Sequence, residues 1–131
     1  MAAAESYPDD LKYHREHDWA RIDGDEAVLG ITWFAQDALG ELVHFEAPST
    51  GSNVKAGSSY GEVESVKAVS DVIAPLSGEV LEVNQAAVDA PETVNEDPYG
   101  DGWLIRIRLS DPGEVDALLD LDAYKQVLAE Q

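Results

Sequence analysis

The chain contains no cysteine, which excludes disulfides, thiolate metal ligands and cysteine nucleophiles. Any sulfur chemistry would therefore have to come from a cofactor. No run approaches the roughly 18 to 20 consecutive apolar residues that a membrane-spanning helix needs. The first ten residues, MAAAESYPDD, are acidic and lack arginine, so we expect neither a secretory signal nor a transit peptide.

Positive charge is also scarce. The sequence has 8 Lys plus Arg against 27 Asp plus Glu, which gives a net charge of −19. A negative field of this size repels phosphate backbones and anionic membrane surfaces, so we expect no binding to nucleic acids or membranes. It favours a monomer and would speed encounters with basic docking patches, although simple solvation of the surface is the alternative explanation.

The length of 131 residues and the hydrophobic content of 44% predict one globular domain, 1–131, with residues 1–10 as a loosely ordered N-terminal segment. Alternating apolar residues and turn signals predict short strands at 18–23, 26–31, 41–47, 78–84 and 103–109, and a pair of strands within 61–75. Helices are predicted at 32–39 and from 111 onward, with a possible break at 120–122, and a loop with one helical turn at 86–95. This pattern favours a mainly β, minor α+β fold: a sandwich or barrel-like pair of sheets.

The most informative segment is GEVESVKAVSDVIAP, residues 61–75, whose valines mirror one another about Lys67 and Ala68. A two-residue turn at this pair would form a hairpin with Lys67 at its tip. The register would place Val66 opposite Val69 and Val63 opposite Val72. A lysine there is accessible to an acylating enzyme, and its acylated stem could anchor a long mobile arm. An ordinary solvated lysine is the alternative, but no other Lys or Arg occurs between Lys55 and Arg106.

A metal site is the competing hypothesis. His14 and His17 have a His-x-x-His spacing, and many carboxylates are available, so a hydrolytic metalloenzyme can be imagined. Because no second spaced pair supports such a site, we expect no bound metal. An unmodified acidic scaffold is a further alternative.

The segment ESVKAVSD (64–71) resembles the lipoylation motif of glycine cleavage H proteins. IAPLSGEVLEVN (73–84) resembles the half-barrel that follows the modified lysine in the wider biotinyl and lipoyl family. Three further stretches resemble the H protein branch: YHREHDWARIDGDEAVLGIT (13–32), AQDALGELVHFEAP (35–48) and VNEDPYGDGWLIRI (94–107). The resemblance runs in order from about residue 11 to about residue 128.

The resemblance implies a barrel-sandwich hybrid, a lipoyl-domain-like β-sandwich with short helices and a C-terminal helix. Lys67 would carry lipoate through an amide, on a carrier without catalytic turnover. A pyridoxal-phosphate glycine decarboxylase would load an aminomethyl group, an aminomethyltransferase would pass its carbon to tetrahydrofolate, and dihydrolipoamide dehydrogenase would reoxidise the dithiol. The alternative is a lipoyl donor or carrier for other lipoate-dependent enzymes. We expect a bacterial-type cytoplasmic protein, or a mitochondrial matrix protein if the chain is a processed form.

The resemblance also suggests roles for residues near the lysine. The lipoylating enzyme would recognise four neighbours of Lys67: Glu64, Ser65, Val66 and Ala68. Asp18 and Asp71 are candidates for a pocket that holds the amine of the aminomethyl-lipoyl arm, the alternative being two solvated acids. Asp18 stands where the family usually has Glu, and Ala38 stands where some relatives have His, so these positions depart from the pattern.

Overall fold

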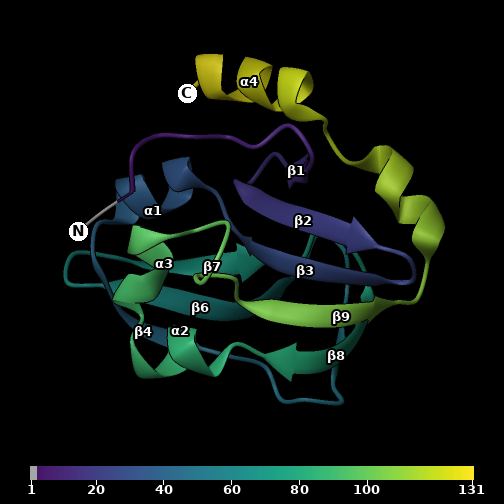
Figure 1. The fold of residues 1–131 in the computed structure, drawn as a ribbon, viewed down its shortest axis with the longest axis horizontal. Coiled ribbons are helices and arrows are strands. Elements are labelled where there is room, and N and C mark those ends of the chain that lie inside the picture. Colours follow the sequence, from purple (N-terminus) through teal and green to yellow (C-terminus); the bar gives the residue numbers. More distant parts are fainter. Residues whose placement is uncertain (1–2) are drawn as a thin grey trace.

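The computed structural model describes residues 3–131 and contains two antiparallel sheets (Figure 1). The six-stranded sheet has the order β1 (Lys12–His14), β2 (Asp18–Asp23), β3 (Glu26–Ile31), β9 (Ile105–Leu109), β8 (Gly78–Val83) and β5 (Asn53–Val54). The three-stranded sheet has the order β4 (Leu42–Glu46), β6 (Ser59–Ser65) and β7 (Val69–Ile73). The predicted mainly β sandwich is therefore confirmed.

The main core lies between the two sheets. Side chains from the larger sheet, such as Leu29 and Ile107, share one buried cluster with Phe45 and Val63 of the smaller sheet. Alternate residues of each strand point into this cluster, as the period of two in a β-strand requires. The burial of these side chains fixes which face of β4, β6 and β7 is turned outward.

The first helix, α1 (Trp33–Leu39), follows the prediction closely. The side chain of Thr32 accepts a hydrogen bond from the N–H of Ala35 and caps its N-terminus. Gly40 ends the helix with φ of 86°, a conformation that glycine adopts without steric cost. The helix therefore begins and ends where local sequence signals predict.

The prediction of a loop with one helical turn at 86–95 is wrong. Two helices occupy this region, α2 (Gln85–Asp89) and α3 (Glu92–Glu96). The side chain of Asn84 accepts a hydrogen bond from the N–H of Ala86 and caps α2. Helices of five residues are too short to show apolar periodicity in a sequence. The short strands β1 and β5 were missed for the same reason.

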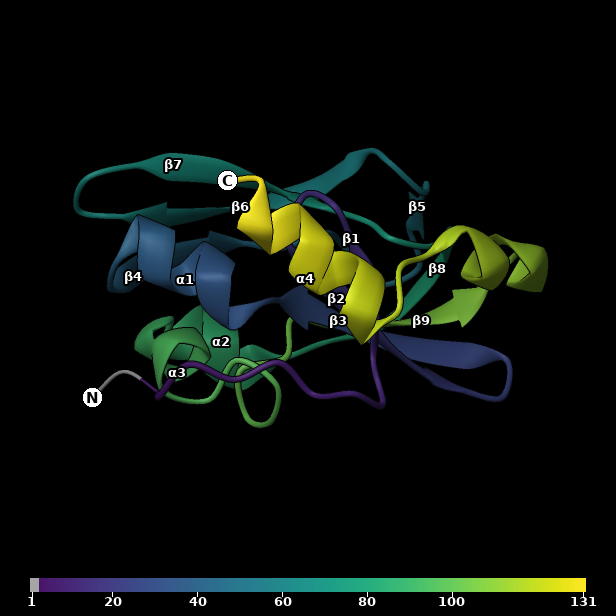
Figure 2. The same cartoon turned by 90° about the horizontal axis from the view of Figure 1, so that it is seen from above.

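The C-terminal segment forms a 3₁₀ helix (Pro112–Ala117) and then α4 (Leu121–Ala129). Asp120 caps α4 by accepting a hydrogen bond from the N–H of Ala123, so the break predicted at 120–122 is a helix start. α4 lies over β1 (Figure 2). The rings of Tyr124 and Tyr13 stack there with centroids 4.6 Å apart. The buried side chains of α4, Tyr124 and Val127, therefore face the body of the protein.

The described part of the N-terminal segment, residues 3–10, makes defined contacts. Ala3 donates its N–H to the carbonyl of Asn95 at 2.9 Å, and the indole N–H of Trp33 donates to the carbonyl of Ala3 at 2.7 Å. Residues 1 and 2 lie outside the described residues. The single-domain organisation and the loose order of 1–10 stay predictions. No helix in the described chain is long and apolar enough to cross a membrane.

Candidate functional site

The hairpin of β6 and β7 carries Lys67 at one end of the three-stranded sheet (Figure 2). The N–H of Ser65 donates to the carbonyl of Ala68 at 2.8 Å, so Val66 and Lys67 are the two central residues of the turn. The prediction of a turn centred on Lys67 and Ala68 is therefore wrong by one residue.

The register of the hairpin shifts accordingly. Val63 lies opposite Ser70, and Val72 lies opposite Gly61, so the predicted valine pairs do not form. Val63 and Val72 are both buried, whereas Val66 and Val69 are exposed. Val63 and Val72 therefore pack into the core, whereas Val66 and Val69 lie at the surface.

Ser65 supplies the physical reason for this register. Its hydroxyl oxygen accepts hydrogen bonds from the N–H groups of Lys67 at 3.3 Å and Ala68 at 3.1 Å. A valine at the corresponding place could satisfy neither group. Ser65 is only 4% exposed, so these bonds form away from bulk water. The hydroxyl holds a turn that lacks the usual Asn-Gly or Gly signal.

Lys67 is exposed, and its stem passes over Gly40. A Cβ at position 40 would lie 3.5 Å from Cε and 3.9 Å from Nζ of Lys67. Within residues 3–131, no acidic side chain forms an ion pair with Lys67. The primary amine is therefore presented on a hydrogen-bonded turn without an ion pair to any described residue.

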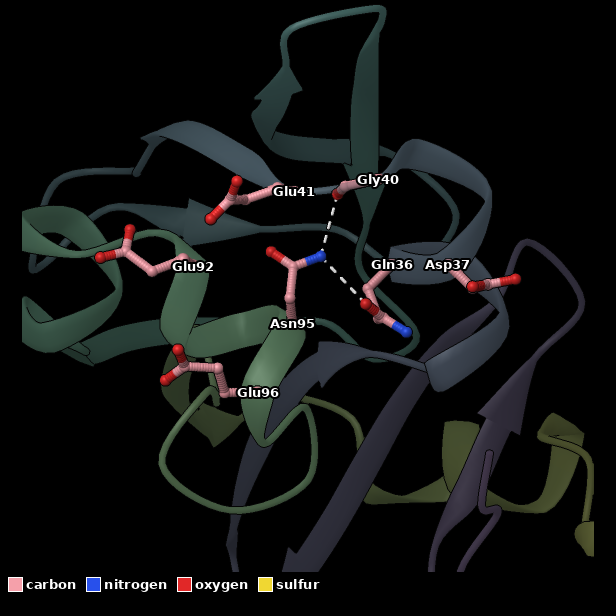
Figure 3. A pocket seen from close by; sticks show the side chains of 7 residues that line it. All are labelled: Gln36, Asp37, Gly40, Glu41, Glu92, Asn95 and Glu96. Atoms are coloured by element: carbon pink, nitrogen blue, oxygen red, sulfur yellow. Dashed lines mark hydrogen bonds between the residues drawn. The ribbon is translucent and has the colours of Figure 1, made fainter. Parts of the chain in front are cut away.

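A pocket of ≈320 Å³ lies beside Gly40 (Figure 3). Its floor is the buried amide of Asn95, which donates to the side chain of Gln36 and to the carbonyl of Gly40, both at 2.9 Å. The amide oxygen accepts the N–H of Leu42 at 2.9 Å. The acidic residues that line the pocket are Asp37, Glu41, Glu92 and Glu96. The hydrogen bond from Asn95 fixes the carbonyl of Gly40, the residue over which the stem of Lys67 passes.

Asp18, the first residue of β2, is 2% exposed. Its Oδ1 accepts the backbone N–H of Ile73 at 3.2 Å, on the edge strand β7. Burial raises the pKa of Asp18 well above its ordinary value; the N–H of Ile73 lowers the pKa by a smaller amount, and nearby Glu16 raises it further. Asp18 is therefore not a solvated acid.

Asp71 occupies a different environment from Asp18. It is exposed, and its carboxylate accepts a hydrogen bond from the hydroxyl of Ser59 at 3.2 Å. It lies on the same strand as Ile73, two residues away, so the backbone brings it to the neighbourhood of Asp18. The two carboxylates do not share a hydrogen bond.

The remaining predicted neighbours lie around the turn. Glu64 is exposed and sits opposite Val69, while Ala68 closes the turn through its backbone. Ala38 stands one residue before the end of α1 and carries no polar group toward the hairpin.

Sequence reasoning missed a buried polar cluster next to Asp18. The hydroxyl of Tyr124 lies 2.8 Å from Nδ1 of His17 and 2.8 Å from the hydroxyl of Thr32. The ring of His17 also contacts Phe34, with centroids 4.4 Å apart. His17 has φ of 73°, which is unusual for a residue with a side chain. The cluster ties α4 to the N-cap of α1, a link that no local sequence signal indicates.

His14 and His17 are both engaged in hydrogen bonds. Nδ1 of His14 accepts the N–H of Glu16 at 3.1 Å, and burial lowers the pKa of both His14 and His17. In the part of the chain that the structure describes, no group of three or more His, Asp or Glu side chains is placed to hold a metal ion.

Comparison with known proteins gives a consistent result. The family model described as glycine cleavage H-protein matches residues 11–131. The glycine cleavage system H protein of Anaeromyxobacter sp. (strain K) is 56% identical over 124 residues, which cover 95% of this chain and 97% of that protein. The corresponding protein of Carboxydothermus hydrogenoformans is 50% identical over 124 residues, 95% of each chain. The crystal structure of a glycine cleavage system H protein from Mycobacterium marinum superposes with a TM-score of 0.86 at 45% identity, and covers 94% of this chain and 99% of that chain.

Proposed function

Because this chain belongs to the glycine cleavage H-protein family and is thus a lipoyl carrier of glycine cleavage, we propose that Lys67 is the residue that bears its lipoate. One observation carries the proposal: an exposed primary amine, without an ion-pair partner among residues 3–131, sits on a turn held by a buried hydroxyl. Such an amine can be acylated without first breaking a contact.

The chain's own contribution at this position is mechanical and electrostatic. Nζ of Lys67 supplies the lone pair for the amide bond; it loses one proton as the activating group leaves the acyl carbon. The hydroxyl of Ser65, and the amide of Asn95 that donates to the carbonyl of Gly40, keep the base of the arm in one place. When bound, lipoate would supply a disulfide that opens to two sulfurs, one a free thiol and the other able to carry an aminomethyl group between active sites. A rigid base with a mobile arm lets one group visit several enzymes.

Asp18 and Asp71 form the proposed resting place for the loaded arm's amine. Asp18 is a buried carboxyl that accepts the N–H of Ile73, and no described lysine or arginine pairs with it. An entering ammonium would stabilise the ionised form of Asp18, because a buried carboxylate requires a partner of opposite sign. Asp71, two residues along β7 from Ile73, would add negative charge at the exposed side. Held in this way, the amine would be protected from premature loss to water.

The partners belong to the glycine cleavage complex. The specific partners we propose are glycine decarboxylase, the aminomethyltransferase, dihydrolipoamide dehydrogenase and a lipoylating enzyme that recognises the turn through Glu64, Ser65, Val66 and Ala68. The chain would act as a monomeric carrier without turnover of its own. The bacterial relatives support a cytoplasmic location.

The experiment is an assay for carbon dioxide release from carboxyl-labelled glycine by glycine decarboxylase. Chains expressed with a lipoylating enzyme and lipoate are compared as wild type, Lys67→Arg and Lys55→Arg. Lys55 is exposed and serves as a matched control. We expect release with wild type and Lys55→Arg and only background release with Lys67→Arg. Equal release with all three chains would contradict the assignment.

A further inference from the structure

Three exposed valines gather around the hairpin tip. Val66 is 87% exposed, Val69 57% and Val43 51%, and these are the exposed large hydrophobic residues among those that the structure describes. Val66 belongs to the turn, and Val69 begins β7. Val43 lies in β4 at the point where its register with β6 shifts between Leu42 and His44. This irregularity turns Val43 outward next to the end of β6.

A row of carboxylates crosses the same face of the sheet. Glu46 lies opposite Glu62, which in turn lies opposite Asp71, and all three are exposed. Like charges directly opposite one another destabilise a sheet. The ion pairs within residues 3–131 involve Arg106 and Arg108 on the other sheet, so no described cation neutralises this row. The mutual repulsion of these carboxylates is therefore not relieved by any described cation, and the row lies on the same face as the exposed valines.

We propose that this outer face of the three-stranded sheet, defined by Val43, Glu46, Glu62, Val66 and Val69, docks the enzyme that attaches lipoate to Lys67. The inference rests on the proposed function of that lysine. The enzyme's complementary surface is apolar opposite the valines and basic opposite the carboxylate row. Apolar contact removes the valines from water, and the opposite charges steer the encounter and set the orientation.

The short reach of an unmodified lysine indicates that the outer face docks the lipoate-attaching enzyme and not the enzymes that later act on the lipoyl arm. Nζ extends only about 6 Å from Cα of its own residue. The tip of the hairpin must therefore enter the acylating enzyme's active site, and the residues beside the tip must touch that enzyme. After acylation, the longer arm lets other enzymes hold the carrier at a distance from the tip. The outer face flanks the tip and is turned away from the larger sheet (Figure 2).

The test measures kcat/KM for lipoyl transfer by a purified bacterial lipoate–protein ligase, supplied with lipoate and ATP, onto the unmodified chain. A double variant, Glu46→Gln with Glu62→Gln, removes two charges from the outer face, and Val69→Thr keeps the shape of its side chain while making it polar. Asp122→Asn with Glu130→Gln is the matched control, because it removes two exposed charges from α4 and its C-cap. Melting temperatures of all chains report folding.

We expect the outer-face double variant to lose about three- to tenfold in kcat/KM and to show a weaker dependence on salt than wild type. Its melting temperature should be unchanged or higher, because cross-strand repulsion is relieved. A merely structural role would lower kcat/KM and melting temperature together. Val69→Thr should lose about two- to fivefold, and the α4 control should stay within about twofold.

Transfer within about twofold of wild type for both outer-face variants would overturn the proposal. Unchanged lipoyl transfer with slower loading by glycine decarboxylase would also overturn it, because the face would then serve a later partner. A wild-type chain that accepts no lipoyl group, while a control lipoyl domain is modified in the same reaction, would overturn both this inference and the proposed role of Lys67. The first two outcomes leave that role intact.

Discussion

The hydroxyl oxygen of Ser65 accepts a hydrogen bond from the N–H of Ala68 at 3.1 Å, across the turn that presents Lys67. The same oxygen accepts the N–H of Lys67 at 3.3 Å. One buried side chain therefore satisfies two backbone groups of the turn. The geometry of the lysine depends on a residue that precedes it by two positions.

The first prediction follows from this contact. Ser65→Ala should lower the free energy of unfolding by about 1 to 3 kcal/mol, because two partly buried N–H groups lose their acceptor. It should also slow lipoylation, because the tip becomes less ordered. Ser70→Ala is the control, since the hydroxyl of Ser70 donates only to an exposed carbonyl. Urea unfolding of the two variants gives the comparison, and equal stabilities would contradict the role assigned to Ser65.

Tyr124→Phe tests the link between α4 and α1. The substitution removes the hydroxyl that contacts His17 and Thr32 but keeps the stacked ring. We expect a loss of about 1 to 3 kcal/mol in the free energy of unfolding, with an unchanged denaturant slope. Tyr7→Phe removes a hydroxyl that bonds only to exposed Glu5 and should cost less than about 0.5 kcal/mol. Similar losses for both variants would be evidence against the buried cluster.

Asn95→Ala tests the floor beside Gly40. It leaves the N–H of Leu42 and the carbonyl of Gly40 without their partner, at a cost of about 1 to 3 kcal/mol. Gln85→Ala is an exposed control, since its amide contacts only Asp89 one helical turn away. Thermal unfolding of both variants checks the prediction. An unchanged melting temperature for Asn95→Ala would show that the floor does not fix this surface.

Asp18 should make stability depend on pH. Because burial raises the pKa of Asp18 in the folded state above the unfolded value of about 3.8, the folded chain holds this proton more tightly than the unfolded chain. Its contribution is fully present below that value and is lost as the pH rises through the raised pKa. Asp18→Asn keeps an oxygen acceptor for Ile73 and removes the titration.

The measurement for Asp18 is the free energy of unfolding of wild type minus that of Asp18→Asn, followed from pH 4 upward. The titration of the acids that both chains share largely cancels in this difference. We expect the difference to fall as the pH rises. A difference that stays constant, or rises, would mean that the pKa of Asp18 is not raised.

Local signals account for the parts of the fold that could be predicted. β2, β3 and α1 were predicted closely because a Gly-Asp turn, a threonine cap and a terminal glycine mark their ends within a few residues. The hairpin register was missed, because the mirrored valines suggested one pairing and the buried hydroxyl of Ser65 imposes another. The hydrogen bonds to Ser65, and not the pairing of valines, therefore determine the register of the hairpin.

The environments of Asp18 and His17 could not be predicted, because contacts between residues far apart in the sequence form them. The hydrogen bond between Asp18 and Ile73 spans 55 residues, and the contact of His17 with Tyr124 spans 107 residues. Neither pair shares a local motif. Lys67 could be proposed from the sequence because its neighbourhood is a continuous segment, whereas the environment of Asp18 is assembled from separate strands.

The central claim is that Lys67 carries the lipoyl group. Its most direct test is intact mass with peptide mapping of wild type, Lys67→Arg and Lys55→Arg, each expressed with a lipoate ligase and supplied lipoate. The account predicts a lipoyl-sized gain on wild type and Lys55→Arg, mapped to the peptide that contains Lys67, and none on Lys67→Arg. No gain on wild type, with a control lipoyl domain modified in the same cells, would contradict it, as would a gain on Lys67→Arg.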